Sequence, residues 1–311
     1  MFASSRAKWS HRYLVLRARA SSKMNLMTSS RPTTVHRWHT LVQQHPVAAY
    51  FALTFAISWS AAVGLAAPSL LRQQPLAKLT GILMFPVMLL GPSLTGILLA
   101  GVTQGRAGLA DLARRLTTWR FAPRWYLVLL IPPLLILTVL SCLAAFASPA
   151  YTPNHFFVGL FFGIPAGLLE EIGWMGYAFP RMRSQTNSFE PAVLLGLLWS
   201  AWHIPVVDFL GAATPHGRWW LLFFLAFSAA LTAIRVLICW VYTNTRSVLS
   251  AQLLHISSTS SLVVFSPARV NAAQEVTWYL LYALTLWLVV ASFSEFAPKH
   301  WRAEQPDRRD L

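Results

Sequence analysis

The sequence predicts an all-α polytopic membrane protein with about eight transmembrane helices in one bundle. Its 311 residues are 56% hydrophobic and only 11% charged, whereas soluble domains carry roughly 25% charged residues. Eight apolar stretches come close to the roughly 20 residues that a membrane-spanning helix needs. Most lysines and arginines lie between these stretches, which is typical of a chain that crosses a membrane repeatedly.

The predicted spans differ in how apolar they are. The fourth contains two glutamates and the seventh is rich in serine, so these two are the weakest. The spans are 46–67, 79–101, 126–148, 155–178, 191–210, 219–242, 248–266 and 276–296.

The distribution of lysine and arginine predicts the orientation of these spans. With a cytoplasmic N-terminus, the inner segments carry 20 of the 25 basic residues, the outer loops carry four, and Arg235 lies inside the sixth span. Positive charge concentrates on the cytoplasmic side of membrane proteins. We therefore expect an integral membrane protein with both termini in the cytoplasm. Topology also accounts for the net charge of +15, so nucleic acid is not an expected partner.

Two tails flank the predicted membrane domain, which covers residues 45–297. Residues 1–44 are basic and are interpreted as a cytoplasmic tail, a targeting segment or the product of an over-long start. Residues 298–311 form a polar cytoplasmic tail.

Residues 105–126 are predicted to form a helix along the cytoplasmic face of the membrane. Leu109, Leu112, Leu116 and Trp119 recur at helical spacing among arginines. Such a helix is attracted to the headgroups of anionic membrane lipids.

Glu170 and Glu171 are the most unusual residues of the fourth span. A charged carboxylate at membrane depth costs roughly 2.5–3.5 kcal/mol on insertion scales, and such residues usually mark function. We expect that at least one is neutral or that a cation lies nearby; Arg181, Arg183 and Arg235 are candidates. The alternative is that both lie at the interface and reach water.

Histidines lie in two further apolar spans. Trp199 and His203 are four residues apart in the fifth span, and His255 and Thr259 are four apart in the seventh. Together with the glutamates, these side chains could converge in a central polar cavity.

The chemistry of such a cavity would suit amide hydrolysis. A buried carboxylate can act as a general base toward water. Two histidines can bind a metal ion or donate hydrogen bonds to an oxyanion. The serine-hydrolase pattern GxSxG and the zinc-protease pattern HExxH are both absent. These residues alone leave an intramembrane hydrolase and an ion-coupled transporter open.

Three motifs resemble those of one known family. EEIGWMGYAFPRMR resembles the first motif of the CPBP family of intramembrane proteases, the CAAX-processing and bacteriocin-processing group also called Abi proteins. WSAWHIP resembles the second motif, and RVLICWVYTNTRSVLSAQLLHISS the third. The similarity extends over roughly residues 45–296.

This resemblance implies an eight-helix intramembrane endopeptidase that hydrolyses a peptide bond in a membrane-associated peptide or protein. By resemblance, Glu170 would activate the attacking water and Glu171 would support it. His203 and His255 would complete the site as oxyanion donors, or would hold a divalent metal such as zinc together with Glu170. Trp199, Thr259 and Arg235 would be supporting residues.

Two positions depart from the family pattern. Met175 stands where the first motif has an arginine, and Thr259 stands where the third has asparagine or aspartate. Threonine supplies one hydroxyl where an asparagine amide offers both a donor and an acceptor group. These departures keep a second interpretation open, in which a non-catalytic family member binds a peptide such as a bacteriocin and gives immunity.

Overall fold

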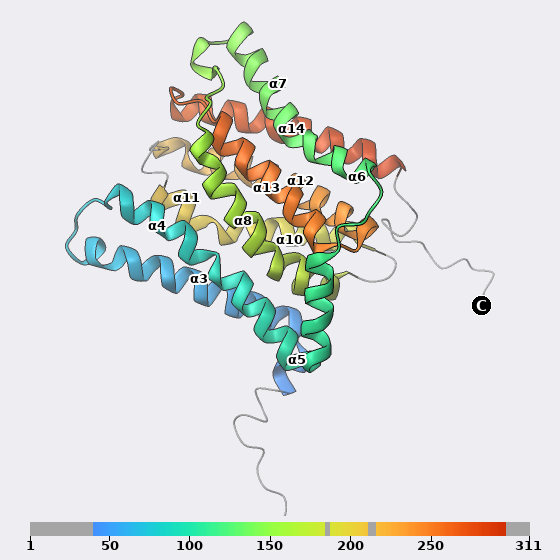
Figure 1. Cartoon of the computed structure of the whole chain (residues 1–311). Coiled ribbons are helices and arrows are strands. Elements are labelled where there is room, and N and C mark those ends of the chain that lie inside the picture. The colour runs from blue at the N-terminus through green and yellow to red at the C-terminus, as the bar shows by residue number, and fades with distance from the viewer. Residues whose placement is uncertain (1–39, 184–186, 211–215, 297–311) are drawn as a thin grey trace, which may run out of the picture. The chain divides into compact units, whose positions relative to one another are not determined.

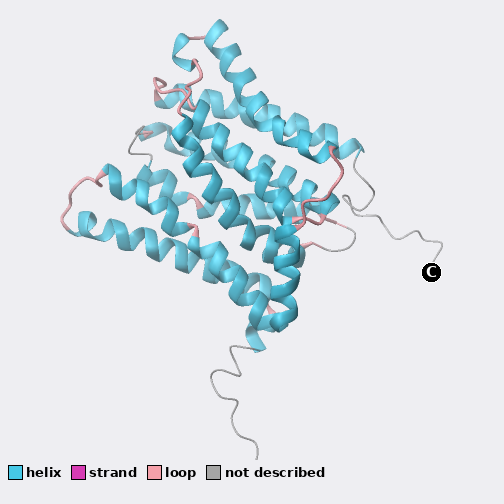
Figure 2. Ribbon diagram, viewed as in Figure 1, coloured by secondary structure: helices cyan, strands magenta, loops and turns pink. Residues whose placement is uncertain are grey.

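The computed structural model describes residues 40–183, 187–210 and 216–296, and within these ranges it contains helices and loops without any strand (Figure 2). Residues 1–39 and 298–311 of the predicted tails lie outside this part. From Pro46 onward the chain forms one compact unit. An all-helical unit suits a bilayer, because every backbone polar group must find its partner inside the membrane.

The α-helices of this unit pack against one another as a bundle (Figure 1). They are α3 (Pro46–Leu71), α4 (Lys78–Met88), α5 (Leu90–Thr117), α6 (Arg124–Leu127), α7 (Ile131–Phe146), α8 (Leu160–Gly173), α9 (Phe179–Met182), α10 (Phe189–Trp202), α11 (Ile204–Leu210), α12 (Trp220–Thr245), α13 (Val248–Phe265) and α14 (Ala272–Phe296).

Seven helical segments in the described part are long and apolar enough to span a membrane. They coincide with seven of the eight predicted spans, so the protein is an integral, multi-pass membrane protein. The remaining predicted span, 191–210, consists of the two shorter helices α10 and α11, which meet at His203. Pro205 explains the break, since proline has no N–H for the helical bond to the residue four before it.

The predicted surface helix at 105–126 is only partly correct. The backbone kinks at Gly105, whose φ of 61° lies in the left-handed region, and a helix continues from there to Thr117. Residues 118–123 are not helical, and α6 begins at Arg124. Thr118 adopts an extended conformation with ψ near 102°, which ends the helix nine residues before the predicted boundary.

A ladder of glycines brings α8 close to α13 (Figure 1). Gly159, Gly163 and Gly167 follow at intervals of four, and Glu171 continues the same spacing. A methyl group on Gly163 would come within 2.5 Å of the Ser260 backbone nitrogen. Small residues allow this kind of close helix approach in membranes. The ladder therefore holds the last turn of α8 against α13.

A tight turn sets α12 antiparallel to α13. Arg246 ends α12 in the left-handed conformation, with φ at 55°. Ser247 then caps α13, where its hydroxyl accepts a hydrogen bond from the Ser250 N–H. This turn places Arg235 and His255, on either side of it, in the same part of the bundle as Glu171.

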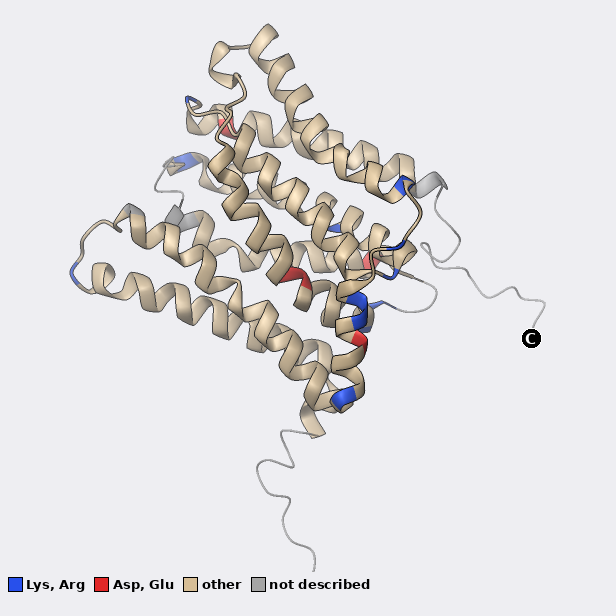
Figure 3. Ribbon diagram, in the orientation of Figure 1, with Lys and Arg blue, Asp and Glu red and all other residues tan. Residues whose placement is uncertain are grey.

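Charge is distributed unevenly over the structure (Figure 3). Lysines and arginines lie mostly at helix ends and in loops, while α8 carries acidic residues inside the bundle. The site is built around these two buried glutamates.

Candidate functional site

Glu170 and Glu171 occupy the last turn of α8 and are buried in the bundle. Their exposed fractions are 1% and 0%. The interpretation that they lie at the interface and reach water is therefore wrong. A π-helix, Trp174–Ala178, begins three residues after the pair, and such turns are frequent at functional sites.

Glu171 is held by a cation and an imidazole from two other helices. Arg235 Nη1 on α12 donates to both carboxylate oxygens, at 2.7 and 2.9 Å. His255 Nδ1 on α13 lies 2.6 Å from Oε1. Of the three arginines that the sequence offers as a charge partner, the structure thus pairs Arg235 with Glu171. A buried carboxylate with such a partner is ionised, because the pair compensates the lost hydration.

Glu170 has a different environment from its neighbour. Its Oε2 accepts hydrogen bonds from the indole N–H groups of Trp199, at 2.7 Å, and Trp174, at 3.1 Å. Within the described residues, no hydrogen bond engages the second oxygen, Oε1. One face of this carboxylate is therefore fixed and the other is available to a small polar molecule.

Both histidines use Nδ1 to bind the protein. His203 Nδ1 lies 2.7 Å from the Trp199 carbonyl oxygen, which can only accept, so Nδ1 carries the proton. His255 Nδ1 faces the ionised Glu171 in the same way. In a neutral imidazole the other nitrogen, Nε2, is then an acceptor. Each neutral ring therefore presents Nε2 as a hydrogen-bond acceptor, and this nitrogen becomes a donor only when the ring is protonated.

Trp199 connects the parts of the site. Its indole bonds Glu170, and the Arg235 guanidinium lies 4.0 Å from its ring centroid. The rings of His203 and His255 each pack edge-on against the Trp199 ring, with 5.1 Å between the ring centroids. A cation over an indole face gains electrostatic attraction. Arg235 therefore binds Glu171 directly and contacts Glu170 through Trp199.

The π-helix is anchored by a residue that the sequence analysis assigned to the membrane surface. Arg115 Nη2 donates to the Gly176 carbonyl at 2.8 Å, and Nη1 donates to the Met175 carbonyl and the Tyr242 hydroxyl. The Arg115 side chain is only 12% exposed, against 70% for Arg114. No sequence signal separates these adjacent arginines, since only packing decides which one points inward.

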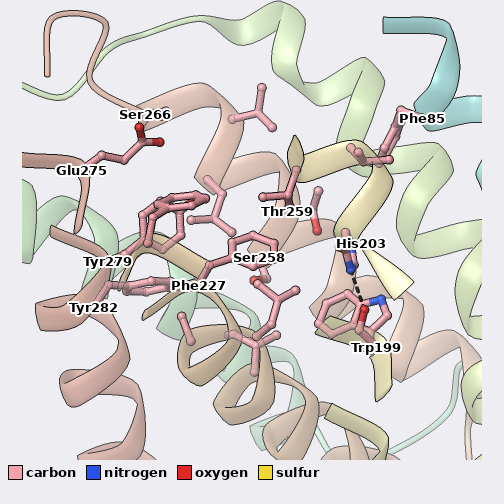
Figure 4. A pocket seen from close by; sticks show the side chains of 18 of the residues that line it. Phe85, Trp199, His203, Phe227, Ser258, Thr259, Ser266, Glu275, Tyr279 and Tyr282 are labelled. Atoms are coloured by element: carbon pink, nitrogen blue, oxygen red, sulfur yellow. Dashed lines mark hydrogen bonds between the residues drawn. The ribbon is translucent and has the colours of Figure 1, made fainter. Parts of the chain in front are cut away.

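The two departures from the family motifs lie in different places. Met175 is fully buried in the π-helix. Thr259 lines a cavity of about 380 Å³ that is also lined by Trp199 and His203 (Figure 4). Neither glutamate lines this cavity, because Trp199 stands between it and Glu170.

The predicted metal site can be tested against this geometry. Within residues 40–183, 187–210 and 216–296, no group of three or more His, Cys, Asp or Glu side chains is arranged to hold a metal ion. Glu171 is already engaged by Arg235 and His255, and Glu170 by two indoles. Within these residues, the geometry therefore gives no ligand set for zinc at His203, His255 and Glu170.

Comparison with known proteins agrees with the motifs. The family model described as "Type II CAAX prenyl endopeptidase Rce1-like" matches residues 152–260, the segment that carries every site residue named above except Arg115. The CAAX prenyl protease 2 of Methanococcus maripaludis is 29% identical over 101 residues, which cover 31% of this chain and 36% of that protein. The match therefore spans about a third of the length of this curated relative. Through this segment, the chain is similar to the type II CAAX prenyl endopeptidases.

Proposed function

We propose that the protein is an intramembrane endopeptidase in which Glu170 activates a water molecule for attack on a peptide bond. The observation that carries the proposal is the asymmetry of the glutamate pair. Glu171 is paired with a cation, whereas Glu170 is fixed through Oε2 and keeps Oε1 free. A carboxylate with one free oxygen can accept a proton from water.

The proposed reaction uses Glu170 together with Thr259 and His203. Glu170 takes a proton from water as the water oxygen bonds the peptide carbonyl carbon. The proton then passes from Glu170 to the leaving nitrogen as the C–N bond breaks, giving a carboxylic acid and an amine. Thr259 can donate a hydrogen bond from its hydroxyl group on the cavity wall to the carbonyl oxygen. His203 Nε2 can accept a hydrogen bond from the water, which orients it.

The substrate we propose is a peptide or membrane-protein segment that enters the cavity from within the bilayer. The cavity is lined mostly by apolar and aromatic side chains, which suits a dehydrated segment. Access to Glu170 then requires movement of the Trp199 side chain, since this side chain separates the carboxylate from the cavity.

The proposal is tested by comparing wild type with Glu170→Gln, which keeps the shape of the side chain and removes its basicity. Both are expressed at equal membrane levels, and new protein termini are compared by mass spectrometry. Glu190→Gln is the matched control, because Glu190 is exposed at the start of α10. We expect new termini with the wild type and with Glu190→Gln that are absent with Glu170→Gln. Identical termini with all three folded proteins would refute the mechanism.

A second function, peptide binding without cleavage, is favoured by one observation. Neither glutamate lines the cavity that is large enough for a ligand. In that case the protein would protect a cell against a peptide by holding it, and protection would survive Glu170→Gln. Measuring peptide sensitivity with the same variants separates the two functions.

A further inference from the structure

The cavity has a second polar end, away from His203 (Figure 4). Glu275 and Ser266 lie at that end, and Tyr279 and Tyr282 lie between it and His203. Glu275, Tyr279 and Tyr282 are spaced by four and three residues, so they share one face of α14. Residues 272–296 lie outside the segment matched by the family model. The family match therefore carries no information about this wall of the cavity.

Glu275 is a carboxylate without a cationic partner. Its Oε2 lies 3.1 Å from His216 Nε2, and its side chain is 17% exposed. Within the described residues, no lysine or arginine forms an ion pair with it. Burial lowers the pKa of the His216 imidazole, which favours its uncharged form. Glu275 lies in the first turn of α14, where the helix dipole favours the ionised form while burial favours the neutral acid.

Aromatic rings surround the approach to this carboxylate. Phe223 stacks on His216 at 3.8 Å between ring centroids, and it packs edge-on against Tyr279 at 5.3 Å. Phe227 lies 5.9 Å from Tyr279. All of these side chains line the same cavity. A cation within about 6 Å of such ring faces is attracted to them, and several rings with one carboxylate form a cage for an ammonium or guanidinium group.

We infer that Glu275, Tyr279, Phe223 and Phe227 form a subsite that binds a cationic side chain, lysine or arginine, of the substrate. The inference rests on the proposed function for its ligand, since the substrate is taken to be a peptide. Apolar walls accept the methylene stem, the rings face the charged group, and the Glu275 carboxylate compensates the charge. In the orientation predicted from lysine and arginine, this end of the cavity faces the outside.

The position of the subsite predicts where the cation lies in the substrate. Ring-to-ring steps of 5.8 and 5.9 Å lead from His203 through Phe227 to Tyr279, and Glu275 lies one helical turn further along α14. An extended peptide advances about 3.3 Å per residue, so the basic residue is expected about three to five positions from the cleaved bond.

Ligand binding is tested first, because it needs no enzyme activity. Purified protein in a non-ionic detergent is titrated with n-hexylammonium and, separately, with 1-hexanol, and the apparent Tm is followed. A ligand that binds the folded state raises Tm with its concentration. We expect a saturable rise with n-hexylammonium only, and a Kd at least about tenfold weaker in Glu275→Gln. Glu190→Gln should behave as wild type.

Three results would overturn the inference. The first is that n-hexylammonium does not raise the Tm of the wild type. The second is that it raises the Tm of Glu275→Gln equally. The third is that 1-hexanol raises the Tm as much as n-hexylammonium does, which would show an apolar cavity only. Should Glu275→Gln not fold, Tyr279→Leu takes its place and should weaken binding about threefold or more through loss of a ring face.

The sequences of the cleaved substrates provide a second test of the subsite. Termini that depend on Glu170 should carry lysine or arginine at the predicted spacing, and Glu275→Gln should lose these sites selectively. Amine binding without any Glu170-dependent terminus would refute the proposed function alone. Cleavage without amine binding would refute the subsite alone.

Discussion

Arg235 on α12 donates through one nitrogen, Nη1, to both carboxylate oxygens of Glu171 on α8, with both side chains fully buried. The other guanidinium nitrogens, Nε and Nη2, find no partner in the described structure. The ion pair is therefore the main compensation for the charge of Glu171, and removal of one member leaves the other alone in an apolar interior.

We expect Arg235→Met to destabilise the folded protein by about 3–5 kcal/mol, because it leaves a buried carboxylate uncompensated. The double variant Arg235→Met/Glu171→Gln should regain most of this stability, since neither charge remains. Thermal or denaturant unfolding in detergent measures both effects. A double variant as unstable as the single one would show that Arg235 contributes through packing instead.

Trp199→Phe should reduce cleavage about tenfold or more. The substitution keeps an aromatic ring but removes the N–H that fixes Glu170 Oε2, a charged hydrogen bond worth about 1.5–3 kcal/mol. Trp202→Phe is the control, because the Trp202 indole N–H has no hydrogen-bond partner. Equal activities of the two variants would contradict a positioning role for Trp199.

Gly163→Ala should destabilise the bundle by about 1–3 kcal/mol, as overpacking does in close-packed interiors. The added methyl group would press on the Ser260 backbone and separate α8 from α13, which lengthens the contact between Glu171 and His255. Gly64→Ala in α3 meets nothing within 4 Å and should be neutral or slightly stabilising. Apparent Tm values of the two variants give the comparison.

Arg115→Gln should lower activity, whereas Arg114→Gln should leave it unchanged. The first variant frees two carbonyl groups of the π-helix that follows the glutamates. The second alters only an exposed pair with Asp111, and exposed pairs contribute about 0–1 kcal/mol. Steady-state cleavage rates with matched protein amounts test this difference. Equal losses in both variants would point to surface charge as the cause.

Much of the fold could be predicted because bilayer thickness dictates the length of an apolar helix. The same reasoning identifies Glu170, Glu171, His203 and His255 as a group, since ionisable residues in apolar spans are costly and are brought together. The distances that join Glu171 to His255 and Arg235 follow from the packing of α8, α12 and α13, which the glycine spacing only suggests.

Other features could not be predicted from local sequence. The π-helix Trp174–Ala178 adds one residue per turn, and its register depends on α5, which packs against it through Leu112 and Arg115. The inward direction of Arg115 depends on its contacts with Met175, Gly176 and Tyr242, which lie far away in the chain. The surroundings of the Glu275 carboxylate could not be predicted either, because they depend on how α12 and α14 pack their aromatic residues around it.

The separation of Glu171 and Arg235 in the chain also bears on how the protein is made. The two residues are 64 positions apart, and α8 precedes α12. At about 5–20 residues per second, synthesis leaves Glu171 without its partner for roughly 3–13 s. Until α12 is inserted, α8 must carry the glutamate as a neutral acid or keep it at the edge of the bilayer. Biogenesis of the bundle therefore includes a charging step, in which the arrival of Arg235 fixes Glu171 in its ionised form before α13 and α14 follow.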